Sequence, residues 1–247
     1  LKIQRTADSK NKQPKEHCDY VSKEYKDLWD KWNISNDVFI RTTESTHIDI
    51  IYNFFTRVVK SNDIYMGEQK GWYCVGCEEF KDIKENSGQP YCSIHKKNLE
   101  WRDEENLFFR LSKYQQLIED LINQEGFIEP ESRRNEIKQF VTKGLKDFSI
   151  SRINVRWGIP VPGYNGHTFY VWFDALLGYI SAIGKKYETT DLDKLTSLGW
   201  PANLHVIGKD IIRFHAIYWP AMLISAGLPI PKKVFGHGFL TKDGTKM

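Results

Sequence analysis

The chain has 247 residues, of which 40% are hydrophobic and 27% charged, and its formal net charge is +3. This composition is typical of a globular protein with a sizeable core and excludes an intrinsically disordered chain. The small net charge gives no reason by itself to expect a nucleic-acid partner. No apolar run approaches the roughly 18 residues of a membrane span, so we expect a soluble protein with no membrane partner.

The first 62 residues are predicted to be helical. Apolar and aromatic side chains recur at helical spacing over residues 18–32 and again over 47–59. Thr46 stands where it could cap the second helix, and Asn62 and Asp63 where that helix could end. Cys18 falls on the first helix and outside any metal-binding pattern.

Residues 63–147 form a segment of short β-strands, expected at 63–67 and 71–74, followed by helices over 111–122 and 133–145. Cys74 and Cys77 are separated by two residues, as are Cys92 and His95. Two such pairs supply a complete tetrahedral set of sulfur and nitrogen ligands for Zn²⁺, and four protein ligands leave no open position for catalysis. The spacing therefore indicates a structural zinc in a reducing compartment. In the alternative interpretation the cysteines are buried apart and His95 is a surface residue.

From residue 148 onwards, predicted strands over 168–173, 203–207 and 234–240 alternate with helices over 175–185 and 211–226. This order with short connections is typical of a right-handed parallel α/β unit. Gly208, Lys209 and Asp210 come between a strand and a helix, where ligands collect in doubly wound sheets. A glycine there admits a phosphate or ribose close to the backbone, and an aspartate can accept bonds from sugar hydroxyls or simply cap the helix.

Two groups of side chains could converge near this junction. Ile211, His215 and Tyr218 are spaced i, i+4 and i+7, on one helical face. The second group comprises Trp172 at a strand end and Ala175, Leu176 and Tyr179 over the following helical turn. Together they would form an aromatic-walled pocket with one imidazole, suited to an uncharged thioether side chain. The alternative is that all of them are ordinary core.

Five segments decide between these interpretations. They are Phe148-Ser149-Ile150-Ser151-Arg152, Trp157-Gly158-Ile159-Pro160-Val161-Pro162, residues 172–179, residues 208–220 and His237-Gly238-Phe239-Leu240. In order and spacing they resemble class I aminoacyl-tRNA synthetases, most closely methionyl-tRNA synthetases, and the resemblance extends over essentially the whole chain. It implies an α/β fold, namely part of a Rossmann-like parallel-sheet domain with a zinc-binding connective insert. The implied activity is ATP-dependent conversion of L-methionine to methionyl-adenylate and transfer to tRNA(Met).

The resemblance also assigns roles to individual residues. The methionine site would comprise Trp172, Ala175, Leu176, Tyr179, Ile211, His215 and Tyr218. The ATP site would comprise Gly208, Asp210, His237, Gly238 and Leu240, with Mg²⁺ accompanying ATP. Arg152 and Lys246 would contribute to catalysis, and the zinc ligands would be Cys74, Cys77, Cys92 and His95. The expected division is a helical part of the catalytic domain over 1–62, the connective insert over 63–147 and the second half of the catalytic domain over 148–247.

Departures from the family pattern lead us to expect an excerpt that is incomplete for catalysis. The His-Ile-Gly-His signature would lie upstream of Leu1, and Lys246-Met247 opens a Lys-Met-Ser-Lys-Ser loop whose remainder would follow. His95 stands where many relatives have Cys, and Leu176 where some have Pro. The alternatives are another class I synthetase or a non-catalytic zinc-bearing RNA-binding module. The cytoplasm is the expected compartment, and an organelle is possible if a targeting segment precedes Leu1.

Overall fold

The computed structural model describes residues 2–77, 79–81, 90–94, 96–153, 155, 157–243 and 245–246, with only the backbone described at 79, 245 and 246. The chain divides into two compact units. Unit 1 comprises Leu1–Phe39, Met66–Leu107 and Ser151–Val171, and unit 2 comprises Ile40–Tyr65, Phe108–Ile150 and Trp172–Met247. Among the described residues, no helix combines the length and the apolar character that crossing a bilayer requires.

Unit 1 begins with two helices, α1 (Lys2–Asp8) and α2 (Pro14–Lys31). Pro14 occupies the first turn of α2, where its missing N–H costs nothing. Ion pairs of Lys15 with Asp19 and of Lys23 with Asp27 add modest support along the exposed face. The helix predicted over 18–32 is therefore confirmed, and it begins one turn earlier.

The β-structure of unit 1 is antiparallel. β1 (Ile64–Cys74) lies between β2 (Glu79–Lys81) and β5 (Glu100–Phe109), and β3 (Tyr91–Cys92) pairs with β4 (Lys97–Asn98). A further pair joins β8 (Ser151–Ile153) to β9 (His167–Phe169). The last two residues of β5 belong to unit 2 and pair there with β7 (Phe148–Ser149).

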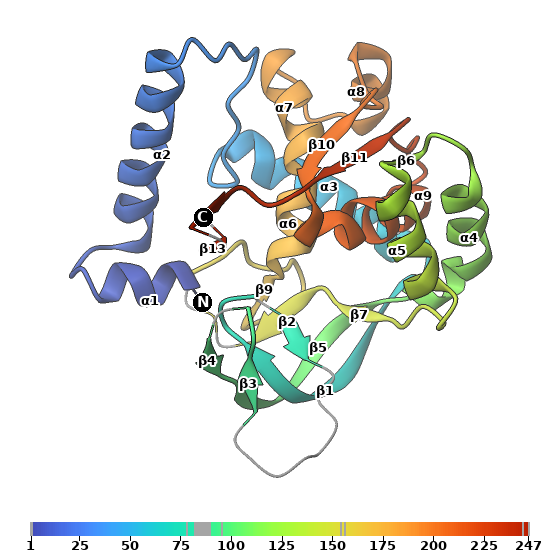
Figure 1. The fold of residues 1–247 in the computed structure, drawn as a ribbon, viewed down its shortest axis with the longest axis horizontal. Helices are drawn as coiled ribbons and strands as arrows, with labels where there is room; N and C mark the ends of the chain where they lie inside the picture. The colour runs from blue at the N-terminus through green and yellow to red at the C-terminus, as the bar shows by residue number, and fades with distance from the viewer. Residues whose placement is uncertain are drawn as a thin grey trace. The chain divides into compact units, whose positions relative to one another are not determined.

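Unit 2 contains the parallel sheet. β10 (His205–Gly208) pairs with β11 (Val234–His237), and β11 pairs with β6 (Ile128–Glu129), both in parallel (Figure 1). The crossover from β10 to β11 runs through η2 (Lys209–Ile211), a π-helical turn η3 (Phe214–Tyr218) and α9 (Trp219–Ser225). A helical crossover is the connection that parallel neighbours require, so the predicted α/β unit is confirmed.

The core of unit 2 forms around α3 (Ser45–Lys60), whose buried face includes Phe54 and Phe55. Both rings meet the ring of Phe173 edge-on, at centroid distances of 5.9 and 6.3 Å, and Phe54 also lies 6.1 Å from Trp219. The predicted cap at Thr46 is wrong, because the helix starts at Ser45 after an extended Glu44 and has no side-chain cap bond.

The described part of unit 2 has eight further elements. They are η1 (Leu111–Tyr114), α4 (Gln115–Asn123), α5 (Glu131–Val141), α6 (Val171–Leu176), α7 (Gly178–Lys186), α8 (Leu192–Leu198), β12 (Thr241–Lys242) and β13 (Thr245–Lys246). The side chain of Asp191 caps α8 by accepting bonds from two backbone N–H groups.

The strands predicted over 63–67 and 71–74 are one continuous strand, β1, and the helix predicted over 133–145 ends at Val141. Two further predicted strands end earlier in the structure. The strand predicted over 168–173 ends at Phe169, pairs antiparallel with β8 rather than in the parallel sheet, and gives way to α6. Phe173 and Leu176, three residues apart, are both buried, which is a helical periodicity that the short apolar run concealed. The strand predicted over 234–240 ends at His237.

Candidate functional site

The carboxyl ends of β10 and β11 bring together residues that the sequence assigned to a nucleotide. Gly208 is the register partner of His237, so the two lie side by side on adjacent parallel strands. A Cβ at Gly208 would lie 2.6 Å from Oδ1 of Asp210, so a larger residue at this position would displace the carboxylate. The imidazole of His237 donates from Nδ1 to the carbonyl of Gly238 at 2.6 Å. These groups therefore form one exposed edge, where ligands of α/β sheets usually bind.

Leu240 lies beyond this edge and is 72% exposed. Lys209 extends toward the same segment, with its ammonium 4.5 Å from the ring centroid of Phe239. Lys246 is on β13, which pairs with β12 in the register Thr241↔Lys246. Its side chain is outside the described residues, so its direction is not defined.

Aromatic residues of α6, α7, β10 and the crossover form a second feature, which we call the aromatic cluster: Trp172, Tyr179, His205, Phe214 and His215. Trp172 stacks on Phe214 with centroids 3.9 Å apart and planes at 10°. Tyr179 contacts both histidines, at centroid distances of 4.0 Å to His205 and 5.6 Å to His215. The structure thus brings together Trp172, Tyr179 and His215, as the sequence predicted.

Hydrogen bonds fix the protonation of His215. Its Nδ1 lies 3.0 Å from the carbonyl oxygen of Ile211, which can only accept, so Nδ1 carries the proton. Nε2 is then the acceptor for the hydroxyl of Tyr179, 2.8 Å away. Ile211 therefore contributes its backbone carbonyl to this arrangement.

Burial makes the aromatic cluster electrically neutral. It lowers the pKa of His215, although the bond to Ile211 opposes the shift, and it raises the pKa of Tyr179 to about 12. Burial and then the charge of His215 lower the pKa of His205 to about 4. Near neutral pH none of the three side chains is charged, so the cluster is suited to an uncharged group.

The other predicted residues of this site are distributed around the cluster. Leu176 is buried and Ala175 partly buried on α6. Tyr218 stacks on Phe148 at 4.4 Å and meets the edge of Phe214 at 5.2 Å, so it adjoins the cluster through Phe214. The i→i+5 bonding of the π-helical turn changes the expected i, i+4, i+7 register, which explains this shift.

Sequence reasoning missed three members of this region. Phe214 and His205 belong to the aromatic cluster, and Trp219 is linked to it through the ring of Trp200. Trp219 is fully buried, 5.6 Å from the ring of Trp200, which in turn lies 6.3 Å from His205. His205 begins a strand, where alternation gave no hint that its ring faces an aromatic neighbour.

Three of the four predicted metal ligands converge in unit 1. The sulfur atoms of Cys74, Cys77 and Cys92 lie within 4.8 Å of one another, and those of Cys77 and Cys92 are 3.7 Å apart. The backbone N–H of Cys77 donates to the sulfur of Cys74 at 3.4 Å, which stabilises negative charge on that sulfur. Burial and then the adjacent thiols raise the pKa of Cys77 to about 12, and a bound cation would oppose that shift by stabilising the thiolate. His95 lies outside the described residues.

Arg152, on β8 in unit 1, is only 7% exposed. Its guanidinium lies 4.0 Å from the ring centroid of Tyr170 and donates to the carbonyl of Ser151 at 2.6 Å. Arg102 and Arg152 both approach the ring of Tyr73, at 4.5 and 5.7 Å. Stacking on aromatic rings holds the Arg152 guanidinium in a defined orientation.

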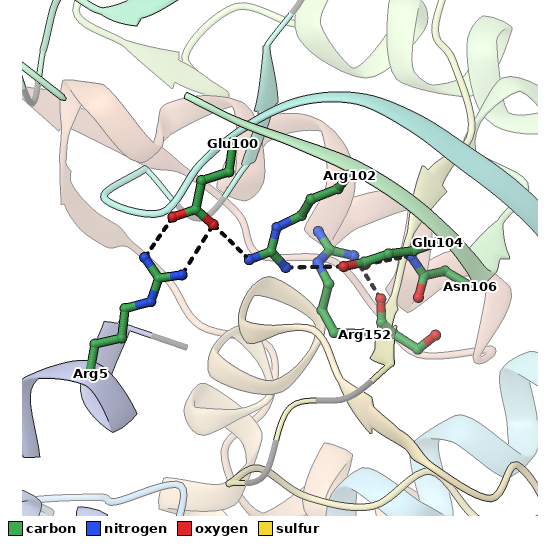
Figure 2. A network of polar contacts seen from close by, with 7 residues as sticks. Arg5, Glu100, Arg102, Glu104, Asn106 and Arg152 are labelled. Carbon is green, nitrogen blue, oxygen red and sulfur yellow. Dashed lines mark hydrogen bonds and ion pairs between the residues drawn. The ribbon is translucent and has the colours of Figure 1, made fainter. Parts of the chain in front are cut away.

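A polar network extends from Arg102 across unit 1 (Figure 2). Arg102 bonds to Glu100 at 3.2 Å and to Glu104 at 3.0 Å, and Glu100 also pairs with Arg5 at 2.7 Å. The amide of Asn106 donates to Glu104 at 3.2 Å. The network connects α1 to β5 and anchors the strand that lies beside β1.

Comparisons with known proteins identify the family of this chain. The family model described as "tRNA synthetases class I (M)" matches residues 1–88 and 81–247. A methionine–tRNA ligase of Nostoc sp. is 56% identical over the whole chain, which covers 47% of that relative. A chloroplastic/mitochondrial methionine–tRNA ligase of Arabidopsis thaliana is 52% identical, and the chain covers 40% of it.

Among solved structures, methionyl-tRNA synthetase of Mycobacterium tuberculosis bound by methionyl-adenylate matches with a TM-score of 0.91 and 37% identity. The match covers all of this chain and 50% of that one. The chain thus spans about half the length of the relatives it matches. It belongs to the class I (M) family of tRNA synthetases.

Proposed function

We propose that this chain is part of a methionine–tRNA ligase, which activates L-methionine with ATP and transfers it to tRNA(Met). One observation carries the proposal: the neutral aromatic cluster and the nucleotide-type strand edge share a single crossover. His215 lies on the crossover that joins β10 to β11, and those strands end at Gly208 and His237. An amino acid and a nucleotide bound at the two places would therefore be neighbours. The relatives named above support the same activity.

The thioether of methionine would bind at the aromatic cluster. Its neutral, polarizable walls favour an uncharged sulfur-containing side chain over a charged one. Ala175, Leu176, Ile211 and Tyr218 would complete the binding site next to Trp172, Tyr179 and His215.

ATP would bind at the edge formed by β10 and β11. Gly208 admits the ribose or a phosphate close to the backbone, and Asp210 can accept bonds from the ribose hydroxyls. His237, Gly238 and the backbone near Leu240 would contact the remainder of the nucleotide. Arg152 and Lys246 would offset charge on the transferring phosphates, as would Mg²⁺ bound with ATP.

The chemistry requires no protein nucleophile. The carboxylate oxygen of methionine attacks the α-phosphorus of ATP, and the bond to pyrophosphate breaks with its electron pair leaving on pyrophosphate. A ribose hydroxyl at the end of the tRNA then attacks the carbonyl carbon, and AMP leaves. The protein contributes positioning and electrostatic stabilisation.

We further propose that the cysteine cluster binds a structural Zn²⁺ with His95 as the fourth ligand. The close approach of three sulfurs supports a cation at this point. Such a site would stabilise an insert with little apolar core of its own. The division into segments 1–62, 63–147 and 148–247 is part of the same proposal.

Amino-acid-dependent ATP–pyrophosphate exchange tests the function. The assay uses this chain and a longer protein that adds at both ends the sequence supplied by its own gene, with a panel of amino acids. We expect the longer protein to show exchange with methionine and not with leucine, isoleucine, valine or cysteine. Exchange with another amino acid would indicate a different class I synthetase. No exchange in either protein, with zinc bound and the fold intact, would favour a non-catalytic RNA-binding module.

The cellular compartment is proposed to be the cytoplasm. A relative described as chloroplastic/mitochondrial makes an organelle the alternative. Localisation of the full gene product in its source cells separates the two.

A further inference from the structure

His47 connects α3 to the two helices that carry Trp172 and Tyr179, two of the five residues of the aromatic cluster. Its Nε2 lies 2.6 Å from Oδ1 of Asp174 on α6, and its Nδ1 lies 2.8 Å from Oγ of Ser181 on α7. Asp174 is two residues from Trp172, and Ser181 is two residues from Tyr179. One imidazole therefore contacts both segments close to their cluster residues.

The hydrogen-bond directions in this group are fixed by its partners. The hydroxyl of Ser181 donates its single proton to the carbonyl of Leu177 at 2.9 Å, so it accepts from Nδ1–H of His47. Nε2 of His47 and the carboxyl group of Asp174 then share one proton. Burial raises the pKa of Asp174 despite the opposing effect of His47, which is consistent with a proton retained between them.

These three residue types also occur in hydrolytic triads, but here they cannot act as one. His47 and Ser181 are both 0% exposed, and the proton of the Ser181 hydroxyl is directed at a carbonyl, away from the imidazole. A substrate could not reach the hydroxyl, and the histidine could not take its proton. The group must act on the protein itself.

Core packing alone does not require these residues. Burying polar side chains costs free energy unless every group is bonded, and an apolar residue at position 47 would avoid that cost. A fully bonded polar group instead selects one arrangement of the elements it joins. The elements joined here are those that present Trp172 and Tyr179.

We propose that His47 is a positioning residue for amino-acid binding: its bonds to Asp174 and Ser181 set the orientations of α6 and α7, and so the places of Trp172 and Tyr179. This inference rests on the proposed function. Because α6 also carries Ala175 and Leu176, the bond to Asp174 has the larger effect.

Two variants separate the two bonds. In His47→Gln the amide nitrogen takes the place of Nε2 and keeps the bond to Asp174. In His47→Asn the amide nitrogen takes the place of Nδ1 and keeps the bond to Ser181. We expect both variants to raise the methionine KM. The rise should be larger in His47→Asn, where it should be about tenfold and at most ~10²-fold. The ATP KM should stay within about twofold of wild type, because the β10–β11 edge is not bonded to His47.

A conservative variant tests whether geometry or charge matters. The amide of Asp174→Asn can donate to Nε2 while His47 still donates to Ser181, so every bond survives without an ion. We expect its methionine KM within about threefold of wild type, whereas Asp174→Ala should match His47→Asn. The matched control is Glu44→Gln, which removes a 2.8 Å ion pair between Glu44 and Lys185 that also joins α3 to α7. It should leave both KM values unchanged.

The assay is ATP–pyrophosphate exchange in the longer protein, with thermal unfolding of each variant alongside. Three results together would support the inference, provided that the wild type shows methionine-dependent exchange. The methionine KM is raised in both His47 variants, their ATP KM is unchanged, and the methionine KM of Asp174→Asn is close to that of the wild type. An unchanged methionine KM in both His47 variants would overturn this inference but not the proposed function. Equal rises in the KM values for methionine and ATP, together with a loss of thermal stability, would do the same. Absence of methionine-dependent exchange in the wild type would overturn the proposed function and this inference with it.

Discussion

Asp63 provides a quantitative test of how unit 2 is held together. Its side chain is fully buried and accepts three hydrogen bonds, from Lys113 at 2.7 Å, Tyr114 at 2.5 Å and Ser225 at 2.7 Å. Ser225 ends α9, the last helix of the crossover that carries His215. Loss of this carboxylate should therefore destabilise the crossover from its far end.

The cost follows from what each donor loses. In Asp63→Ala the hydroxyls of Tyr114 and Ser225, each 5% exposed, lose a charged acceptor, at ~1.5–3 kcal/mol per bond. Lys113 is 53% exposed and regains water, so it adds little. The expected loss is about 3–5 kcal/mol in the free energy of unfolding. Asp63→Asn keeps an oxygen for the hydroxyls and should lose only about 1–2 kcal/mol.

Urea unfolding followed by tryptophan fluorescence at pH 7 measures these differences. Wild type should be the most stable, then Asp63→Asn, then Asp63→Ala. Glu136→Gln is the control, because it removes only an exposed pair with Arg133 and should change stability by less than about 0.5 kcal/mol. An Asp63→Ala protein within about 1 kcal/mol of wild type would refute the reasoning.

The same carboxylate makes stability depend on pH. Burial raises the pKa of Asp63, but the bonds from Lys113, Tyr114 and Ser225 outweigh burial and bring the pKa below its usual 3.8. Because the folded pKa is the lower one, the stabilisation is fully present above about pH 5 and is lost as pH falls through the folded pKa. The stability difference between wild type and Asp63→Asn should therefore shrink below about pH 4.

Three further predictions concern the sites. Tyr179→Phe removes the donor to His215 and leaves a buried nitrogen unpaired. In the exchange assay the methionine KM should therefore rise about 5- to 100-fold with the ATP KM unchanged. An unaltered methionine KM would exclude the Tyr179–His215 pair from substrate binding. Gly208→Ala puts a methyl group 2.6 Å from the Asp210 carboxylate and displaces it, so the ATP KM should rise more than the methionine KM, and the reverse order would count against a nucleotide at this edge. Cys77→Ser should abolish stoichiometric zinc measured by atomic absorption and lower the thermal midpoint, whereas a metal-free wild type of equal stability would contradict a structural metal.

The sequence predicted those parts of the fold that depend on local pattern. The helices of α2 and α3 follow from apolar spacing, and the parallel pair β10–β11 follows from strand–helix order. β6, by contrast, has two residues and no periodicity, and only its partner β11 makes Ile128–Glu129 a strand. The end of β9 was missed because an apolar run of this length fits either a strand or a buried helical turn.

Residues of the candidate site were predictable where their spacing in the sequence or a family motif identifies them. Cys74, Cys77 and Cys92 converge as their spacing indicated, and Gly208 meets His237 because both end parallel strands. Phe214 could not be assigned in this way, because a π-helical turn has no distinct sequence signature. His47 was identified only as part of an amphipathic helix, since its partners Asp174 and Ser181 are more than a hundred residues away and their bonds depend on tertiary structure.

Under the proposed function, the neutrality of the aromatic cluster determines which amino acids it can reject. His215 has both nitrogens engaged, by the carbonyl of Ile211 and the hydroxyl of Tyr179, so it offers no charge to a charged substrate side chain. Such a side chain would lose its hydration without compensation, which makes rejection strong. An aliphatic side chain of similar size meets no such penalty, because one methylene changes binding in an apolar site by only about 1–3 kcal/mol. If the cluster binds methionine as proposed, its discrimination against leucine must therefore come from shape, and that shape depends on how rigidly Trp172 and Tyr179 are held.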